Sequence, residues 1–411
     1  MTVVPDGWTL YTPHEIAGRE KDALVIGPFG SNLKTSDYRD EGVPLIFVKD
    51  IRAENFSRPR AHVSIVKAAE LKAHQVLPGD ILVTKMGDPP GDVAVYDSDV
   101  PGIITADCIR LRPTSQFDRK YLVHSLRTPN VRHQIDAITT GAAQKKVNLD
   151  RFRTRLHIAA PPHVEQKRIA AVLDQVDALR AKRREAIALL ENLNQSIFRS
   201  MFGNALENEA GYPRQRMLEW VDPERPITYG ILKPGEDQQD GAPYVRVVDM
   251  KDGGIDTSAI RRTTREISNQ YKRSLLRSGD ILMSIRGHVG RLAVVPEELE
   301  GANITQDSAR LAVPAESARY VMECMRTPEA QHWMERRTKG AAVKGINLGD
   351  IKTLEIPVPP LELQQRFSFR ATKVDQLVSR EYAHLAELDA LFASIQHRAF
   401  RGELWADASA A

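Results

Sequence analysis

Two stretches of the chain have the hydrophobic spacing of long helices. Apolar residues recur at alternating steps of three and four between residues 169 and 197, and again between residues 374 and 395. A proline pair, Pro161–Pro162 or Pro359–Pro360, precedes each stretch and ends the segment before it. The heptad-like spacing predicts two coiled-coil helices. The seam positions are Ile169, Val172, Val176, Leu179, Ala186, Leu190, Leu193 and Ile197, then Val374, Leu377, Leu385, Leu388, Leu391 and Ile395.

Arg183 and Glu381 each occupy an expected seam position, so a charge interrupts both seams. One such helix alone is typical of a core element or a homodimer zipper. Because this chain has two, the seams can bury each other, which favours an antiparallel pair within one chain. From Glu165 to Ser200 the first helix would be about 54 Å long, at roughly 1.5 Å per residue. That length would hold the flanking domains roughly one to one and a half duplex turns apart, at about 34 Å per turn.

The segments before these helices have the composition of short β-strands and turns. Runs beginning at Val43 ("VPLIFV") and Gly79 ("GDILVTK") are rich in β-branched and apolar residues. Runs beginning at Ala242 ("APYVRVV") and Gly279 ("GDILMSI") mirror them. The loops around these strands are rich in glycine, proline and polar residues and match poorly between the two halves. The change of period predicts an α/β (α+β) domain followed by a long helix, twice over.

The matching runs establish an internal duplication. Gly79 and Gly279 are separated by 200 residues, Gly141 and Gly340 by 199, and the two proline pairs by 198. Several matches in one order with a nearly constant shift indicate a tandem repeat of about 200 residues. Each copy is large enough to bury its own core. We therefore expect a first domain at residues 1–160, a central helix at 161–205, a second domain at 206–358 and a C-terminal helix at 359–405.

Composition and charge restrict the class of protein only weakly. The chain has 411 residues and a net charge of +3, and residues 1–205 contain 29 Lys/Arg against 24 Asp/Glu. No domain is strongly basic, so an assignment to nucleic acid needs other support. The absence of an apolar leader or a long apolar run predicts a cytoplasmic protein without a membrane segment. Cys108 and Cys324 are not equivalent in the repeat, so neither a shared disulfide nor a repeated metal site is indicated.

The motifs of common enzymes are missing from the sequence. It has no phosphate-binding loop, no H-E-x-x-H motif and no paired C-x-x-C motif. Asp88-Pro89-Pro90 begins like the motif of an adenine-amino methyltransferase, but Gly91 replaces the aromatic residue that would stack on the base. A turn between strands explains this segment better. We expect a recognition protein with no catalytic residue, no metal site and no intrinsic cofactor.

The order of motifs resembles a known family. Each half ends with a "TxGAAxKxxNL"-type loop and a "PPxxEQxRI"-type segment, followed by a "VDxL" helix and a terminal "SIFRSMFG" or "SIQHRAFRGEL". Over essentially the whole chain this combination is similar to the specificity subunit of type I restriction-modification enzymes. The resemblance implies two target recognition domains, each reading one half of a bipartite, asymmetric DNA site, joined by an antiparallel helix pair with pseudo-twofold symmetry.

The same resemblance implies the partners. The long helices would dock two methyltransferase subunits and, through them, the restriction and translocase subunits. S-adenosylmethionine, ATP and Mg²⁺ are then expected on those partners. The sequence leaves two alternatives open, a specificity chain for a fused methyltransferase-nuclease and a scaffold that binds proteins instead of DNA.

Candidate DNA-contacting residues lie in the loops. Lysines in the glycine-rich loops suit contact with phosphates, polar groups in the variable loops suit base edges, and one cation follows each "GDIL" strand. A solvated turn is the alternative for each of them. The candidates are Ser31, Asn32, Lys34, Lys85, Lys145, Lys146, Tyr229, Lys233, Arg286, His288 and Lys344. For partner docking, the alternative to a solvated helix face, the candidates are Arg180, Lys182, Arg183 and Arg184.

Overall fold

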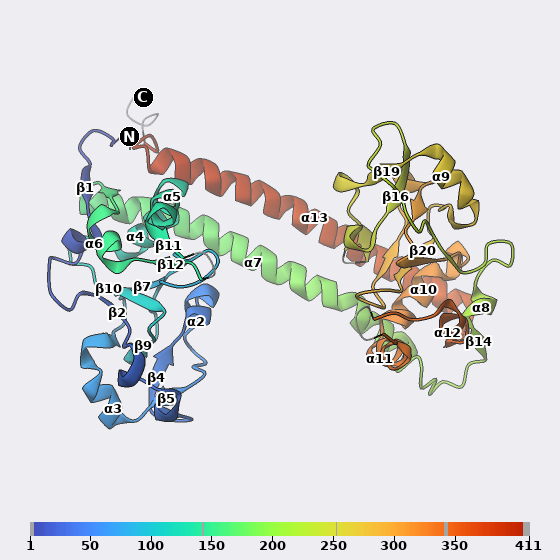
Figure 1. The fold of residues 1–411 in the computed structure, drawn as a ribbon, viewed down its shortest axis with the longest axis horizontal. Helices are drawn as coiled ribbons and strands as arrows, with labels where there is room; N and C mark the ends of the chain where they lie inside the picture. The colour runs from blue at the N-terminus through green and yellow to red at the C-terminus, as the bar shows by residue number, and fades with distance from the viewer. Residues whose placement is uncertain (1–3, 142–143, 252, 341–343, 406–411) are drawn as a thin grey trace. The chain divides into compact units, whose positions relative to one another are not determined.

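The computed structural model describes residues 4–141, 144–251, 253–340 and 344–405. The chain forms two compact units (Figure 1). The first comprises the residues up to Arg184 together with those from Ala383 onward, and the second is Glu185–Tyr382. Each unit thus contains one α/β domain and one half of each long helix. The predicted tandem α/β architecture with long helices is confirmed.

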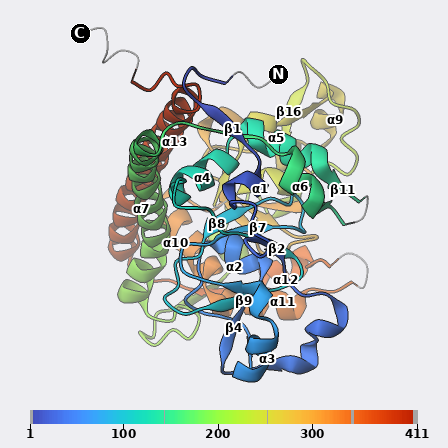
Figure 2. The same ribbon diagram turned by 90° about the vertical axis from the view of Figure 1, so that its left-hand side faces the viewer.

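The first unit is built on two sheets. One is antiparallel, in the order β2 (Leu24–Ile26), β10 (Cys108–Leu111), β7 (Ile81–Thr84), β8 (Val93–Val95). The other has the order β3 (Tyr38–Arg39), β5 (His62–Val63), β4 (Val43–Ile46), β9 (Gly102–Ile104), β6 (Gln75–Val76), with β4 and β9 parallel. In Figures 1 and 2 the first sheet lies between the second sheet and the helices α4 (Arg119–Leu126) and α6 (Leu149–Arg155).

The second unit repeats this plan. Its antiparallel sheet has the order β15 (Thr228–Tyr229), β23 (Ser308–Leu311), β20 (Ile281–Ser284), β21 (Leu292–Val294). Its second sheet has the order β19 (Arg261–Thr263), β16 (Ala242–Val245), β22 (Asn303–Ile304), again with one parallel pair, β16 and β22. The two copies therefore share the order and direction of their common strands as well as sequence motifs, while the second sheet of the first unit has two more strands, β3 and β6.

Short helices and two-stranded pairings complete both units. In the first they are α1 (Pro13–Ile16), α2 (Val48–Ala53), α3 (Ile65–Glu70), α5 (Pro129–Ile138), β1 (Thr9–Tyr11) with β13 (Ile158–Ala160), and β11 (Thr139–Thr140) with β12 (Lys146–Val147). In the second they are α8 (Met217–Trp220), α9 (Arg265–Gln270), α10 (Ala315–Arg326), α11 (Pro328–Arg337), α12 (Leu348–Lys352), β14 (Arg214–Arg216) with β24 (Glu355–Pro357), and β17 (Met250–Lys251) with β18 (Gly254–Ile255).

The repeated "GDIL" sequence leads into β7 and β20, which are inner strands of the antiparallel sheet in each unit and are called the central strands below. Every residue of β7 and of β20 is buried, because each strand packs against apolar residues on both faces. Ile81 and Val83 belong to the core beneath the helices, whereas Leu82 belongs to the core between the two sheets. This double burial explains the continuous apolar run, which differs from the alternation of a half-exposed strand.

The aspartate of the "GDIL" sequence holds the turn before the strand. Asp80 accepts a hydrogen bond from the Leu77 backbone N–H at 2.8 Å and binds the Arg112 guanidinium through two bonds of 2.7 and 2.8 Å. Asp280 likewise accepts from the Arg277 N–H and binds Arg225 through bonds of 2.6 and 2.8 Å. Both carboxylates are buried, so each needs its guanidinium. The arginine comes from a different place in each copy.

The long helices α7 (His163–Phe202) and α13 (Leu361–Ala399) follow the proline pairs as predicted. They run antiparallel within each unit. In the first unit Arg180 of α7 binds Asp389 of α13, and in the second Asn194 binds Asp375 at 2.8 Å. Figure 2 shows α4 beside α7, and Lys120 of α4 binds Asp174 of α7 at 2.6 Å.

The buried seam differs in part from the predicted one. Four residues expected in the seam, Leu179, Leu193, Leu377 and Leu391, are 53%, 38%, 42% and 47% exposed. Leu173, which was not expected there, is buried. The physical reason is that the polar pairs Arg180–Asp389 and Asn194–Asp375 occupy part of the contact.

Both cysteines are buried, unpaired thiols. Burial raises the pKa of Cys108 and of Cys324 to about 12. The reactive thiolate is therefore scarce at neutral pH. Among the described residues, no helix combines the length and apolarity needed to cross a bilayer.

Candidate nucleic-acid interface

In the first unit, the loop after β7 lies against the glycine-rich loop that was predicted to contact phosphate. The Gly87 N–H donates to the carbonyl of Lys145 at 3.3 Å, and the Val147 N–H donates to the carbonyl of Lys85 at 2.8 Å. Lys146 opens strand β12, and its side chain is exposed. Three lysines from two separate motifs are thus brought together. Residues 142–143 of the glycine-rich loop lie outside the described residues.

Lys85 is the buried member of this group. Its ammonium lies 4.4 Å from the centroid of the Phe29 ring and donates to the carbonyl of Ala106 at 3.4 Å. Burial, opposed by the charge of Asp107, lowers the pKa of Lys85 below its ordinary value. A cation over an aromatic face is favourable and fixes the ring above it. Lys85 therefore supports Phe29 more than it faces solvent.

Lys145 is held at the surface by a carboxylate. Its ammonium lies 2.9 Å from Asp88, and both side chains are well exposed. The ion pair lowers the pKa of Asp88 and raises that of Lys145. Water and salt screen an exposed pair of this kind, so the ammonium can exchange the carboxylate for another anion.

Ser31, Asn32 and Lys34 follow Phe29 on an exposed segment. Ser31 and Asn32 end a short 3₁₀ helix, Gly30–Asn32, and Lys34 caps the next one with its backbone N–H bound to Asp37 at 2.8 Å. The side chains of these three residues are exposed. Their position next to Phe29 places them on the same part of the unit as the lysines.

In the second unit two of the candidates, Tyr229 and Arg286, line an open cleft of about 790 Å³. Tyr229, Arg286, Gln306 and Asp307 form one part of its lining, with Lys339 and Asn347 on the glycine-rich loop opposite. The Arg286 guanidinium donates to Gln306 at 3.0 Å and lies 3.9 Å from Asp307. A cation, an amide and a phenol therefore face one opening, which is the chemistry that reads base edges.

The other candidates of the second unit, Lys233, His288 and Lys344, are exposed. The carbonyl of Lys344 accepts from the Gly287 N–H at 2.9 Å, which repeats the Lys145–Gly87 contact of the first unit. The carbonyl of His288 accepts from the Ser284 hydroxyl, and its ring is exposed. Lys233 is exposed after β15. Residues 341–343 lie outside the described residues.

Lys85 and Arg286 differ in environment because they are offset by one position. The carbonyl of Asp107 accepts from the Lys85 N–H at 2.7 Å and from the Met86 N–H at 3.3 Å. In the second unit the carbonyl of Asp307 accepts from the Ile285 N–H at 2.8 Å and from the Arg286 N–H at 3.3 Å. Lys85 and Ile285 are therefore equivalent and buried, and Arg286 is exposed. Each copy has a cation after its central strand, but only that of the second copy is exposed to solvent.

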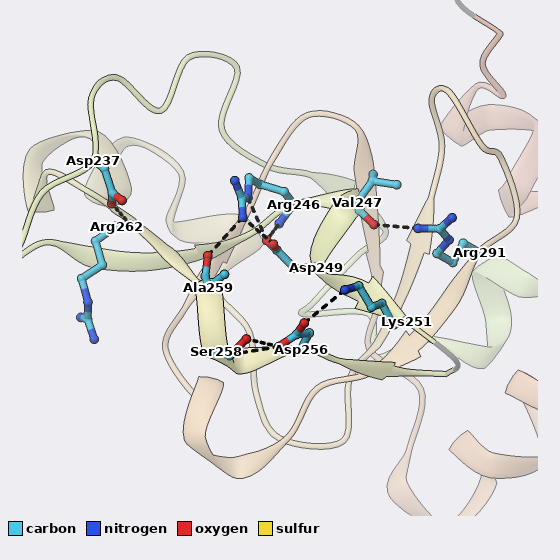
Figure 3. Close-up of polar contacts among 10 residues, drawn as sticks. All are labelled: Asp237, Arg246, Val247, Asp249, Lys251, Asp256, Ser258, Ala259, Arg262 and Arg291. Carbon is cyan, nitrogen blue, oxygen red and sulfur yellow. Dashed lines mark hydrogen bonds and ion pairs between the residues drawn. The ribbon is translucent and has the colours of Figure 1, made fainter. Parts of the chain in front are cut away.

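Sequence reasoning missed three arginines near strands β16 to β21 of the second unit (Figure 3). Arg246 binds Asp249 through two bonds of 2.6 and 3.0 Å, and Arg291 donates to the carbonyls of Val247 and Met250. The third, Arg262, points away from these contacts in Figure 3 and donates to the carbonyl of Gly241 at 3.0 Å. Arg246 and Arg291 thus hold the chain that leads into β17.

Four more arginine and lysine candidates lie on α7. Arg180 is largely buried, with bonds of 2.6 Å to Asp389 and 2.5 Å to Asp177 and with the Phe392 ring 4.4 Å away. Arg184 is exposed and 3.4 Å from Asp389. Lys182 is exposed and Arg183 is half-buried. Docking through these residues stays a prediction, and Lys182 and Arg184 are the members whose side chains are accessible.

A family model named the type I restriction modification DNA specificity domain matches residues 30–191 and 229–388. The chain belongs to this family. The two matches cover one repeat each, so the predicted resemblance to specificity subunits is confirmed. Among the described residues, no group of three or more His, Cys, Asp or Glu side chains could hold a metal ion.

Sequence similarity to individual proteins supports this assignment. The chain is 28% identical to the type I restriction enzyme EcoBI specificity subunit of Escherichia coli, over 92% of this chain and 84% of that protein. It is 23% identical to the EcoKI specificity subunit of Escherichia coli strain K12, over 98% and 90%.

Solved structures share the fold. A type I restriction-modification S subunit from M. genitalium covers 97% of both chains with a TM-score of 0.56 and 15% identity. A chain from a study of complex assembly and conformational transition of the type I R-M system covers 98% of this chain and 100% of its own, with a TM-score of 0.55 and 20% identity.

Proposed function

We propose that this chain is the non-catalytic DNA specificity subunit of a type I restriction-modification complex, with each repeat reading one half of a bipartite, asymmetric site. The observation that supports it most is one sheet framework, present twice, that presents different side chains at the same place. The first copy presents Lys145, Lys146 and Phe29, and the second presents Tyr229 and Arg286. Different side chains on a shared framework suit two different half-sites.

The partners in this proposal are two methyltransferase subunits, docked on α7 and α13, and through them the restriction and translocase subunits. S-adenosylmethionine, ATP and Mg²⁺ would be bound by those subunits. This chain would position the methyltransferases on the DNA and leave the chemistry to them. The exposed Lys182 and Arg184 are cations available for that contact.

The proposal is tested by mapping adenine methylation after co-expression of the full chain with its methyltransferase. Replacing residues 27–60 with the matching segment of another specificity subunit is expected to change one half of the methylated sequence, and replacing residues 225–250 the other half. The unaltered pair is the control. A change in both halves from either replacement would contradict two independent readers.

The same co-expression experiment distinguishes the two alternative functions. Methylation at a defined sequence that depends on this chain excludes a scaffold that binds only proteins. For a fused methyltransferase-nuclease, methylation and cleavage would require a single partner chain. Co-purification of the tagged full chain counts the partner chains directly.

A further inference from the structure

Each unit contains a glycine at a position where a side chain would collide with backbone atoms. A Cβ on Gly27 would lie 2.1 Å from the carbonyl oxygen of Thr105, and a Cβ on Gly230 would lie 1.9 Å from that of Ile304. Both distances are far below van der Waals contact, and the obstacle is backbone in both cases. The chain therefore crosses the end of the parallel strand in the same way in both units.

Strand register shows that these two glycines are equivalent. Ile26 pairs with Ile109, and Tyr229 pairs with Ala309, which lies at the matching position of the second repeat. Gly27 and Gly230 each follow the paired residue. The offset between the copies is three residues larger here than at the "GDIL" strands, which hid the match in the sequence.

Two positions after each glycine the chain exposes a large apolar side chain. Phe29 is 53% exposed and Leu232 is 48% exposed. A single exposed apolar residue is common on protein surfaces and needs no explanation. The same exposure at one structural position in two copies, whose loops otherwise differ, indicates a function for the position.

Basic and polar residues accompany both apolar residues, in direct contact at Phe29 and as close neighbours in the sequence at Leu232. The Phe29 ring rests on the Lys85 ammonium, and Lys146 is near enough to Lys85 to lower its pKa further. Leu232 is followed by Lys233 and is preceded by Tyr229, which shares the cleft with Arg286. An apolar tip among cations matches a duplex, in which phosphates flank the apolar parts of the bases.

We propose that Phe29 and Leu232 are specificity-determining residues that make apolar contact with the bases, each within the half-site of its own unit. The base group is either a thymine methyl in the major groove or the face of an unstacked base step. This inference rests on the proposed DNA-reading function and adds the residues that distinguish bases without hydrogen bonds. The nearby lysines would hold the phosphates and set the register.

The test measures DNA binding by the full chain in complex with its methyltransferase. The probe is a duplex with the sequence mapped by methylation, and the competitor is a duplex with that sequence scrambled. Phe29→Ala is expected to weaken binding about tenfold without changing its salt dependence, because an apolar contact releases no counterions. Leu232→Ala should act alike. Phe29→Leu and Leu232→Phe keep an apolar tip and should retain most of the affinity.

Duplexes in which one half of the site is scrambled show which half each residue contacts. When the half read by the first unit is scrambled, Phe29→Ala should no longer weaken binding, whereas Leu232→Ala still should. Replacing thymine by uracil in that half identifies a methyl contact if the difference between wild type and Phe29→Ala disappears, and a base step if it persists. Either result supports the proposal.

Two results would overturn the inference. One is unchanged affinity of both alanine variants for the mapped site, and the other is an equal loss on mapped and scrambled duplexes. Both leave the proposed function standing, because the wild-type complex would still prefer the mapped site. If the wild-type complex shows no such preference, the proposed function itself fails. An unchanged melting temperature of the variants excludes a folding defect.

Discussion

Lys85 and Lys146 belong to one cluster of lysines but suit different roles. Lys85 is buried beneath Phe29, with its pKa lowered by burial, whereas Lys146 is exposed at the start of β12. A phosphate contact needs an accessible charge, so Lys146 fits that task and Lys85 does not. Sequence reasoning selected both lysines but had no means to distinguish them, because burial depends on the Phe29 ring from a distant segment.

The first prediction concerns Lys146. Lys146→Ala should weaken DNA binding on all sequences alike and reduce the slope of log affinity against log salt by about one, since about one counterion fewer is released. Binding measured at several salt concentrations tests this. Lys120→Ala is the matched control, because Lys120 is engaged with Asp174 of α7 and should leave the slope unchanged. An unchanged slope for Lys146→Ala would contradict a phosphate contact.

The second prediction concerns Asp256 near β18. Hydrogen bonds from Ser258, with the Lys251 ammonium 3.2 Å away, lower the pKa of Asp256 from its ordinary 3.8 to about 2. A lowered pKa in the folded state stabilises the fold above pH 3.8, and this stabilisation is lost as the pH falls towards 2. Asp256→Asn should therefore be less stable than wild type near neutral pH, and the difference should shrink in acid.

Urea unfolding from about pH 6 to about pH 3 measures this difference. Asp240→Asn, which changes an exposed carboxylate of the preceding loop, serves as the control. A difference that is independent of pH would show that the hydrogen bonds, and not the charge of Asp256, stabilise this segment.

At the scale of elements, the central strands and long helices were predictable and the details of their contacts were not. The "GDIL" strands and the proline-led helices depend on local patterns of apolar residues, which the sequence displays directly. The seam of α7 and α13 includes Arg180 and Asn194, whose buried positions depend on Asp389 and Asp375 more than 180 residues away. A polar residue in a heptad pattern looks like a surface position until its partner is known.

Part of the candidate interface was not predicted from the sequence, for a related reason. The role of Gly27 follows from the closeness of a distant strand, and Phe29 appeared to be an ordinary loop residue. The glycine-rich loops were found because they repeat at a nearly constant shift, and the cations after β7 and β20 were found because each follows a repeated "GDIL" strand. Arg246 and Arg291 were missed because the first copy has Phe47 and Asp92 at the matching positions.

The third prediction tests how α7 anchors the second unit. Phe198 is fully buried, with the Phe202, Tyr320 and Phe367 rings 5.0 to 5.8 Å from its own. Phe198→Ala should lower the free energy of unfolding of this unit by about 3–5 kcal/mol, because it removes a large side chain and leaves a cavity. Calorimetry of the full chain measures the loss.

Leu189→Ala on the same helix is the control for the change in helix propensity and in side-chain size. Leu189 is largely exposed, so its truncation should change stability by no more than about 0.5 kcal/mol. Equal losses for the two variants would mean that the aromatic cluster contributes little to the unit.

At the scale of the whole molecule, the duplication gives one chain two units with a common plan. The same strand order, the same parallel pair and the same two-bond aspartate–arginine contact occur in both units. Each unit has its own hydrophobic core and half of each long helix. Folding is thus organised by unit, and both units include part of each long helix.

The fourth prediction follows from this organisation. A chain whose second recognition domain is replaced by a copy of its first should direct methylation to a symmetric sequence, in which the first half-site appears twice as an inverted repeat. The inversion is expected from the pseudo-twofold symmetry that the sequence resemblance implies, because a twofold arrangement of readers gives a palindromic site. Methylation mapping tests this. An unchanged asymmetric site would contradict one reader per half.

The aspartate–arginine contacts also limit how new specificities arise by recombination. Asp80 takes its arginine from after strand β10, whereas Asp280 takes its arginine from before strand β15. A crossover inside the unit that joins the first half of one copy to the second half of the other leaves one buried carboxylate with no guanidinium, and the reciprocal product has two. Exchange of a complete unit keeps every pair intact, so recombinants that survive should have their junctions at the long helices.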